Sequence, residues 1–195
     1  MKPELILIGG GGHCASCIDV IEQENKFTIA GFVDINDAVV KLLGYSLLGS
    51  DDDLKRLKAD YDYAFVTVGQ IKSPEMRMRL YENIKSLGFR LPAIVSPRAY
   101  VSKHASVGEG TIIMHDALIN VRATIGNNCI INSKALIEHD AVVKDNCHIS
   151  TAAIVNGGTI VRQGTFVGSN AVTREGVQTR ENDFIKAGEL FKGYA

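Results

Sequence analysis

A period of six residues in the second half of the chain constrains its fold more than any other feature. Twelve consecutive hexads, over residues 101–172, all begin with Val or Ile and carry Ala, Thr or Cys at the fifth position. Fourth positions favour turn-forming residues. This pattern predicts a parallel β-helix in which each hexad supplies one short strand and one turn, and three hexads form a triangular coil. Thr173 and Thr179 break the pattern, so we expect a frayed fifth coil over residues 173–190.

The first half reads as alternating strands and helices. Residues 5–8 form a continuous apolar run typical of a buried parallel strand, and Gly9 to Gly12, His13 and a helical pattern follow. A second strand, residues 27–34, ends in an acidic residue. We further expect helices over 51–58 and 74–87 and strands over 63–69 and 92–95. The sequence therefore predicts an α/β Rossmann-like domain over residues 1–96, followed by the β-helix domain over 97–195.

The glycine-rich turn suggests a ligand for the first domain. Gly11, Gly12 and His13 precede or open the helix, where free backbone N–H groups favour phosphate, and Asp34 ends the second strand, where a carboxylate meets a ribose or base. A mononucleotide or nucleotide-sugar fits best. A dinucleotide fits less well, because Cys14 stands where the fingerprint requires glycine, and a purely structural turn remains the third alternative.

Composition excludes several other classes. The net charge of −1 argues against nucleic acid and anionic membranes as partners. No apolar stretch is long enough to insert in a membrane, and the N-terminus does not resemble a signal peptide. The four cysteines lack disulfide or metal spacing, so we expect reduced thiols, no metal site and a cytoplasmic location.

The repeat also makes unusual polar residues visible. His139 lies between Glu138 and Asp140, and an imidazole beside a carboxylate is suited to general base catalysis. Adding one 18-residue coil to position 139 reaches Gly157, so we expect uncovered backbone above this histidine. His148 occupies a sixth position that is otherwise mostly aliphatic, where it either contacts a thioester or pantetheine amide or is a structural histidine.

Four segments carry a family resemblance: residues 7–13, 31–34, 132–140 and 148–150. A short Rossmann-like domain with this glycine turn, followed by a hexapeptide-repeat β-helix, resembles bacterial sugar acetyltransferases of the sialic acid O-acetyltransferase and bacillosamine N-acetyltransferase type. The resemblance implies a left-handed β-helix, a homotrimer, and acetyl-CoA bound between neighbouring β-helices. It also implies a nucleotide-activated sugar held by the first domain.

The resemblance assigns roles to individual residues. It implies that His139 is the general base, oriented by Asp140 or Glu138, and that Asn132 lies near the sugar. The remaining assignments are His148, Gly157 and Gly168 at acetyl-CoA, and His13 and Asp34 at the nucleotide-sugar. The C-terminal segment departs from the family, because residues 188–193 lack the usual Gly-x-Pro-Ala sequence.

The expected reaction is acetyl transfer from acetyl-CoA to the amine of a UDP- or dTDP-linked 4-amino sugar, with direct attack on the thioester. One alternative is O-acetylation of sialic acid or a related sugar. An alternative from another class is a non-catalytic trimeric scaffold that binds a nucleotide.

Overall fold

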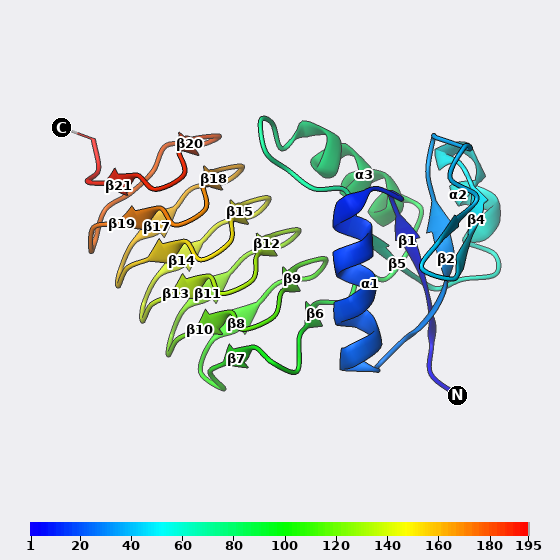
Figure 1. Cartoon of the computed structure of the whole chain (residues 1–195), viewed down its shortest axis with the longest axis horizontal. Helices are drawn as coiled ribbons and strands as arrows, with labels where there is room; N and C mark the ends of the chain where they lie inside the picture. The colour runs from blue at the N-terminus through cyan, green and yellow to red at the C-terminus, as the bar shows by residue number, and fades with distance from the viewer. Residues whose placement is uncertain (195) are drawn as a thin grey trace.

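The computed structural model describes residues 1–194 and consists of a small α/β domain packed against the end of a long prism of stacked strands (Figure 1). The N-terminus lies on the α/β domain, and the chain ends at the far end of the prism. One helix, α1, lies between the α/β sheet and the first coils of the prism. Both expected architectures, the Rossmann-like domain and the left-handed β-helix, are therefore confirmed.

The α/β domain is built on a five-stranded sheet in the order β3-β4-β2-β1-β5. The strands are β1 (Glu4–Ile8), β2 (Thr28–Val33), β3 (Lys41–Leu42), β4 (Tyr45–Gly49) and β5 (Tyr63–Val66). All pairs are parallel except the β3–β4 hairpin. Because β1, β2 and β4 run in the same direction, the residues that follow them meet at one edge of the sheet, which is where ligands bind in such folds.

Helices cover both faces of this sheet. α1 (Gly12–Glu24) packs buried side chains such as Cys14 and Ile18 against Leu5 and Leu7 of β1 on one side and against the prism on the other. The short helices η1 (Asp51–Asp53) and α2 (Leu54–Leu57), together with α3 (Glu75–Ser86), lie on the opposite face. This arrangement holds the glycine turn and the prism in fixed positions relative to each other.

The prism has three faces, each a parallel sheet of two-residue strands. The first face contains β6 (Ile94–Val95), β9 (Ile112–Ile113), β12 (Ile130–Ile131), β15 (His148–Ile149), β18 (Phe166–Val167) and β20 (Phe184–Ile185). The second contains β7 (Tyr100–Val101), β10 (Leu118–Ile119), β13 (Leu136–Ile137), β16 (Ile154–Val155), β19 (Val172–Thr173) and β21 (Leu190–Phe191). The third contains β8 (Ser106–Val107), β11 (Thr124–Ile125), β14 (Val142–Val143) and β17 (Ile160–Val161).

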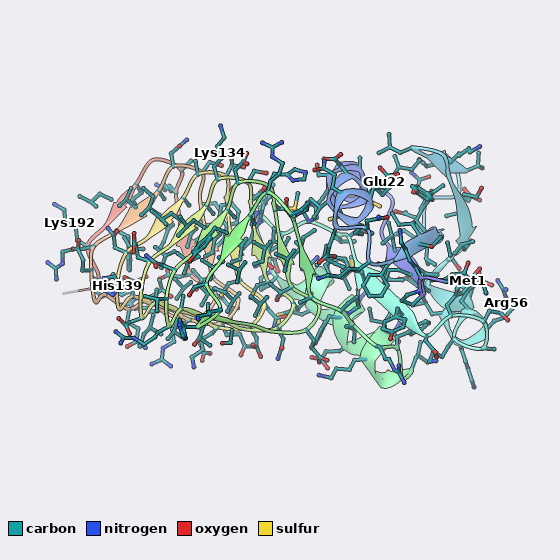
Figure 2. All side chains as sticks on the ribbon, turned by 90° about the horizontal axis from the view of Figure 1, so that it is seen from below. Met1, Glu22, Arg56, Lys134, His139 and Lys192 are labelled. Carbon is teal, nitrogen blue, oxygen red and sulfur yellow. The ribbon has the colours of Figure 1, made fainter. Side chains whose placement is uncertain are left out.

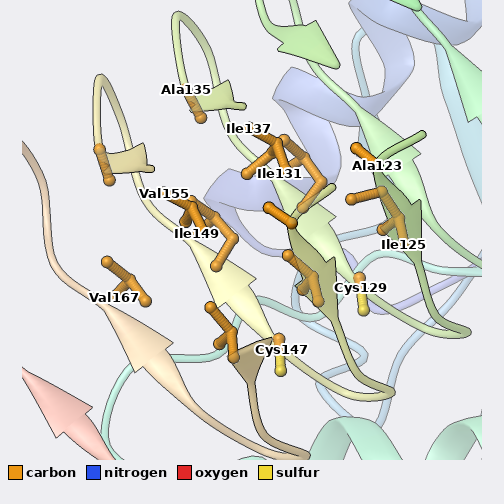
Figure 3. Packing of buried hydrophobic residues seen from close by; sticks show 14 of the residues in the cluster. Ala123, Ile125, Cys129, Ile131, Ala135, Ile137, Cys147, Ile149, Val155 and Val167 are labelled. Atoms are coloured by element: carbon orange, nitrogen blue, oxygen red, sulfur yellow. The ribbon is translucent and has the colours of Figure 1, made fainter. Parts of the chain in front are cut away.

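The hexad positions explain the geometry of the coils. First and fifth positions fill the interior, as Ile131, Ile137, Ala135 and Cys147 show in Figure 3. Fourth positions adopt left-handed backbone conformation without interruption from Gly110 through Asp140 to Asn182. Gly, Asn and Asp tolerate this conformation best, which accounts for their frequency there.

Three expectations about individual strands need correction. Residues 94–95 were expected in the Rossmann-like sheet, but β6 pairs with β9 and begins the prism. The β3–β4 hairpin was not predicted. The fifth coil is more regular than expected, since β20 and β21 continue two of the three faces, and only the third face is reduced, to a single bridge between Ile160 and Gln178.

Candidate functional site

His139 lies at the corner of the prism between β13 and β14, and its imidazole is paired with a carboxylate. Nδ1 of His139 is 2.8 Å from Oδ2 of Asp140. Asp140 occupies the left-handed fourth position, with φ of 60°. Arg122, one coil earlier, binds the same carboxylate through Nε at 2.6 Å and a terminal nitrogen at 2.8 Å. The coil spacing therefore assembles an Arg–Asp–His chain at this corner.

The interactions among Arg122, Asp140 and His139 fix the charge of the carboxylate and the tautomer of the imidazole. The Arg122 guanidinium and the His139 ring hold the pKa of Asp140 well below its usual range. A permanently ionised carboxylate only accepts hydrogen bonds, so His139 carries its proton on Nδ1 and leaves the lone pair of Nε2 facing outward. Such an imidazole is ready to accept a proton at Nε2.

The two neighbouring carboxylates have different roles. Glu138 accepts hydrogen bonds from Asn120 Nδ2 at 2.7 Å and from the backbone N–H of His139 at 3.2 Å. It therefore fixes the backbone of the corner, whereas Asp140 contacts the ring. Of the two carboxylates, Asp140 is the one hydrogen-bonded to the imidazole, and its role in orienting a catalytic base stays a prediction.

Gly157 lies over the His139 ring, as the coil spacing predicted. A Cβ at Gly157 would be 2.9 Å from both Cε1 and Nε2 of His139. The next residue, Gly158, donates its N–H to the His139 carbonyl at 3.1 Å. Within residues 1–194 the N–H of Gly157 has no acceptor, so a free donor lies near Nε2 of His139.

His148 and Asn132 form a second cluster, on the face of the prism that adjoins the α/β domain. His148 is buried, with Nδ1 against the carbonyl of Gln70 and Nε2 3.3 Å from Nδ2 of Asn132. Burial lowers its pKa to about 4, so the ring is neutral. Both ring nitrogens are engaged within the protein, which makes His148 a junction between the domains; its contact with acetyl-CoA stays a prediction.

The glycine turn lies beside this cluster. Gly11 is the N-cap of α1, and a Cβ at Gly11 or Gly12 would meet no neighbour, so both face open space. His13 is half-buried, and its buried Nε2 has no partner within residues 1–194. Burial, with Arg77 nearby, lowers the pKa of His13 to about 3. His13 and Asn132 line the same cavity of about 420 Å³.

Asp34 is closely tied to the glycine turn. Its Oδ2 accepts the N–H of Gly10 at 2.5 Å and its Oδ1 accepts the N–H of Asn36 at 2.8 Å. It borders a cleft of about 220 Å³ at the carboxyl edge of the sheet. The carboxylate thus shapes the turn, and contact with a nucleotide stays a prediction.

The predicted residues fall into two separate groups. His139 lies at one edge of the prism, and Lys134, from the corner beside Asn132, lies at the opposite edge (Figure 2). Gly168 has a packing role, because a Cβ there would be 2.4 Å from the backbone nitrogen of Ala187. A single chain does not bring the proposed base next to the glycine turn.

Three residues that support these groups were not predicted from the sequence. Arg122 was detectable, because one coil separates it from Asp140. Gln70 and Arg77 carried no local signal. Gln70 donates to the carbonyls of Asn146 and Gly164 on the prism. Arg77 is fully buried and binds only backbone carbonyls, at distances of 2.8–3.3 Å.

The first domain is similar to a known protein family. Residues 4–84 match the family model described as the PglD N-terminal domain. No curated protein sequence matches the chain.

Solved structures resemble the whole chain, including the prism that follows the α/β domain. PerB from Caulobacter crescentus, in complex with CoA and GDP-perosamine, is 29% identical with a TM-score of 0.91 over 99% of this chain and 90% of that one. The acetyltransferase domain of PglB from Neisseria gonorrhoeae, in complex with acetyl coenzyme A, is 25% identical with a TM-score of 0.89 over 96% and 90%. The predicted resemblance to hexapeptide-repeat sugar acetyltransferases is confirmed.

A third structure concerns a histidine. It is a histidine-to-asparagine mutant of perosamine N-acetyltransferase from Caulobacter crescentus, in complex with CoA and GDP-perosamine, with 28% identity and a TM-score of 0.92 over 99% of this chain and 90% of that one. Within residues 1–194 of the present chain, no group of three or more metal-ligating side chains gathers, and no helix is long and apolar enough to cross a membrane.

Proposed function

We propose that this protein transfers the acetyl group of acetyl-CoA to the amine of a nucleotide-linked 4-amino sugar. The observation that carries the proposal is the His139–Asp140 pair beneath Gly157. It places an oriented base and a free backbone donor at one corner of a fold whose solved relatives bind CoA and acetylate amino sugars.

The reaction follows from these two groups. Nε2 of His139 accepts a proton as the sugar amine attacks the thioester carbonyl, and Asp140 stabilises the resulting imidazolium. The N–H of Gly157 donates to the oxyanion of the tetrahedral intermediate. When the intermediate collapses, the C–S bond breaks, and the imidazolium returns its proton to the CoA thiolate. The products are the N-acetyl sugar and free CoA.

Substrate binding is assigned to the glycine turn and to the cluster of Asn132 and His148. The N–H groups at Gly11, Gly12 and His13 suit the diphosphate, because they lie at the N-terminus of α1. Asn132, beside His13, is assigned to the sugar. The family resemblance implies a uridine or thymidine nucleotide, whereas the PerB structure contains GDP-perosamine. His148 and Gly168 are assigned to acetyl-CoA.

A homotrimer would complete the site. His139 and the glycine turn are separate in one chain, so a neighbouring copy must supply one of them. The second face of the prism suits such a contact, because every sixth position on it is apolar: Tyr100, Leu118, Leu136, Ile154, Val172 and Leu190. None of these side chains is fully buried. Packing of three prisms along this face would cover them and form grooves for acetyl-CoA.

Release of free thiol from acetyl-CoA tests the proposal. The wild type should release CoA with a nucleotide-linked 4-amino sugar, and His139→Ala should reduce kcat about 10²–10⁴-fold. His104→Ala is the matched control, since His104 is an exposed histidine of the same prism without a carboxylate partner for its ring within residues 1–194. A near-wild-type rate for His139→Ala would refute the mechanism.

The choice of acceptor separates the alternatives. Turnover with sialic acid but not with amino sugars would establish O-acetylation. No turnover with any acceptor, combined with no thermal shift by acetyl-CoA, would establish the non-catalytic scaffold.

A further inference from the structure

The cleft of about 220 Å³ lies at the carboxyl ends of β1, β2 and β4, and α3 forms its outer wall. Ile8, Val33 and Leu80 form its apolar floor. Two apolar side chains at its mouth, Ile35 and Met76, are 77% and 48% exposed. Exposed apolar walls around a narrow cleft suit a flat aromatic ring, which a nucleoside base provides.

The two carboxylates of this cleft, Asp34 and Asp51, differ in whether their oxygens already accept hydrogen bonds from the protein. Both oxygens of Asp34 already accept backbone N–H groups. Asp51 follows β4, and within residues 1–194 its carboxylate accepts no hydrogen bond. Partial burial raises the pKa of Asp51, which is the effect expected of a carboxylate that lacks compensating donors. Asp51 therefore has both oxygens free for a ligand.

Arg79 supplies the complementary charge. It projects from α3 into the same cleft, and its contact is with the sulfur of Met76 at 3.1 Å. No ion pair joins Arg79 to Asp51 or to another carboxylate in the described part of the chain. The cleft thus offers a ligand the two carboxylate oxygens of Asp51 as acceptors and the guanidinium of Arg79 as a donor.

The common bases differ in how they match this arrangement. Guanine places two donors side by side, N1–H and the 2-amino group, followed by the acceptors O6 and N7, and arginine binds O6 and N7 well. Uracil and thymine offer one donor between two acceptors. Adenine alternates one donor with ring acceptors. Only guanine engages both oxygens of a carboxylate.

We propose that Asp51 and Arg79 select a guanine nucleotide, with Asp51 accepting N1–H and the 2-amino group and Arg79 donating to O6. This inference deepens the proposed function, on which it rests, and departs from the uridine or thymidine nucleotide first expected. Asp51 and Arg79 are specificity-determining residues and lie far from the acetyl transfer.

Calorimetric titration of the full chain, without acetyl-CoA, tests this selection. GDP should bind at least about tenfold more tightly than UDP or dTDP. IDP, which lacks only the 2-amino group, should bind about tenfold more weakly than GDP because one oxygen of Asp51 loses its donor. Asp51→Asn should abolish the difference between GDP and IDP.

Asp52→Asn is the matched control, because Asp52 lies in the same short helix but is exposed and outside the cleft. It should preserve the difference between GDP and IDP. Circular dichroism of both variants verifies the fold. UDP or dTDP binding as tightly as GDP would overturn the inference, and so would an unchanged preference in Asp51→Asn.

The outcome also separates this inference from the proposed function. Nucleotide binding without base preference overturns the inference alone. Guanine-selective binding without acetyl transfer supports the inference and overturns the proposed enzyme activity. Failure of every nucleotide to bind overturns both the inference and the nucleotide-linked substrate.

Discussion

Gly157 covers the imidazole of His139 so closely that a single added methyl group would lie 2.9 Å from Nε2. This contact joins residues one coil apart, and it places a backbone donor above the proposed base. The space above Nε2 is where the acceptor amine and the thioester carbonyl must meet, so it has to stay free of side chains.

Gly157→Ala should therefore reduce activity with little loss of stability. Gly157 is not at a left-handed position, so the backbone accepts alanine, but the methyl group must displace the exposed His139 ring. We expect kcat to fall about 10²-fold, since small misplacements of a reacting group have effects of that size. Thiol release and thermal melting measure the two effects. The control is Gly176→Ala, where added atoms meet open space; Gly176 has φ of 64°, as Ala152 has 56°, so this variant should lose some stability through its backbone but keep its activity. An equal loss of activity in the control would contradict the steric explanation.

Asp140→Asn should lower activity through the imidazole. The variant retains an acceptor for Nδ1–H but loses the charge that stabilises the imidazolium, so kcat should fall about 10²–10³-fold with a smaller change in KM. Asp116→Asn is a close control, because Asp116 holds the same turn position and pairs with Arg98 at 2.7 Å, but it does not contact a histidine ring. Equal losses in both variants would assign Asp140 to the stability of the corner alone.

Acid should destabilise the folded protein through the buried His148 and the half-buried His13. The pKa of His148 is lowered by burial to about 4, so the folded state stays neutral while the unfolded state takes up a proton below pH 6.5. Stability from this group is complete above pH 6.5 and falls as the pH decreases toward 4, by about 2–3 kcal/mol at pH 4.5. His13 acts in the same direction.

Urea unfolding at pH 7 and 4.5 measures this effect. His148→Gln should show a smaller loss of stability than the wild type between the two pH values, whereas His104→Gln, at an exposed position, should show the wild-type loss. An unchanged loss in His148→Gln would show that other groups dominate acid unfolding.

Arg77 should be essential for the junction between the domains. It binds the carbonyls of Val66 and Val68 at the end of β5 and those of Gly110 and Asn128 on the prism. Arg77→Met would leave these buried carbonyls without donors, so the free energy of unfolding should fall by at least about 3 kcal/mol. Arg79→Met, two residues along α3 and exposed, should change stability by less than about 0.5 kcal/mol. Similar values for both variants would contradict this role.

Features set by residues close together in the sequence were predicted more accurately than features set by contacts between distant segments. The prism was predictable because its core positions recur every six residues. The β3–β4 hairpin was not, because its turn places Leu43 at φ of 47°, a conformation that leucine seldom adopts, so the usual Asn-Gly or Asp-Gly signal is missing. β6 was assigned to the wrong sheet because two residues do not specify a partner.

The same distinction applies to the candidate site. The relation between His139 and Gly157 was predicted because both belong to the repeat. The contact between His148 and Gln70 joins residues from different domains, so no local sequence pattern could predict it. Asp51 and Arg79 line one cleft because β4 and α3 border the same edge of the sheet; the helix over 74–87 was predicted, but β4 was not.

The stacking of coils has an evolutionary consequence. Each coil adds one strand spacing, about 4.8 Å, to the length of the prism. Gain or loss of a complete coil between β6 and His139 would move the histidine relative to the α/β domain by that step while keeping it at the same corner. Changes of one or two residues would instead rotate every later side chain out of register. The distance between His139 and the glycine turn of the α/β domain can therefore change in steps of one coil. Such steps offer a route to proteins that accept sugars of different length.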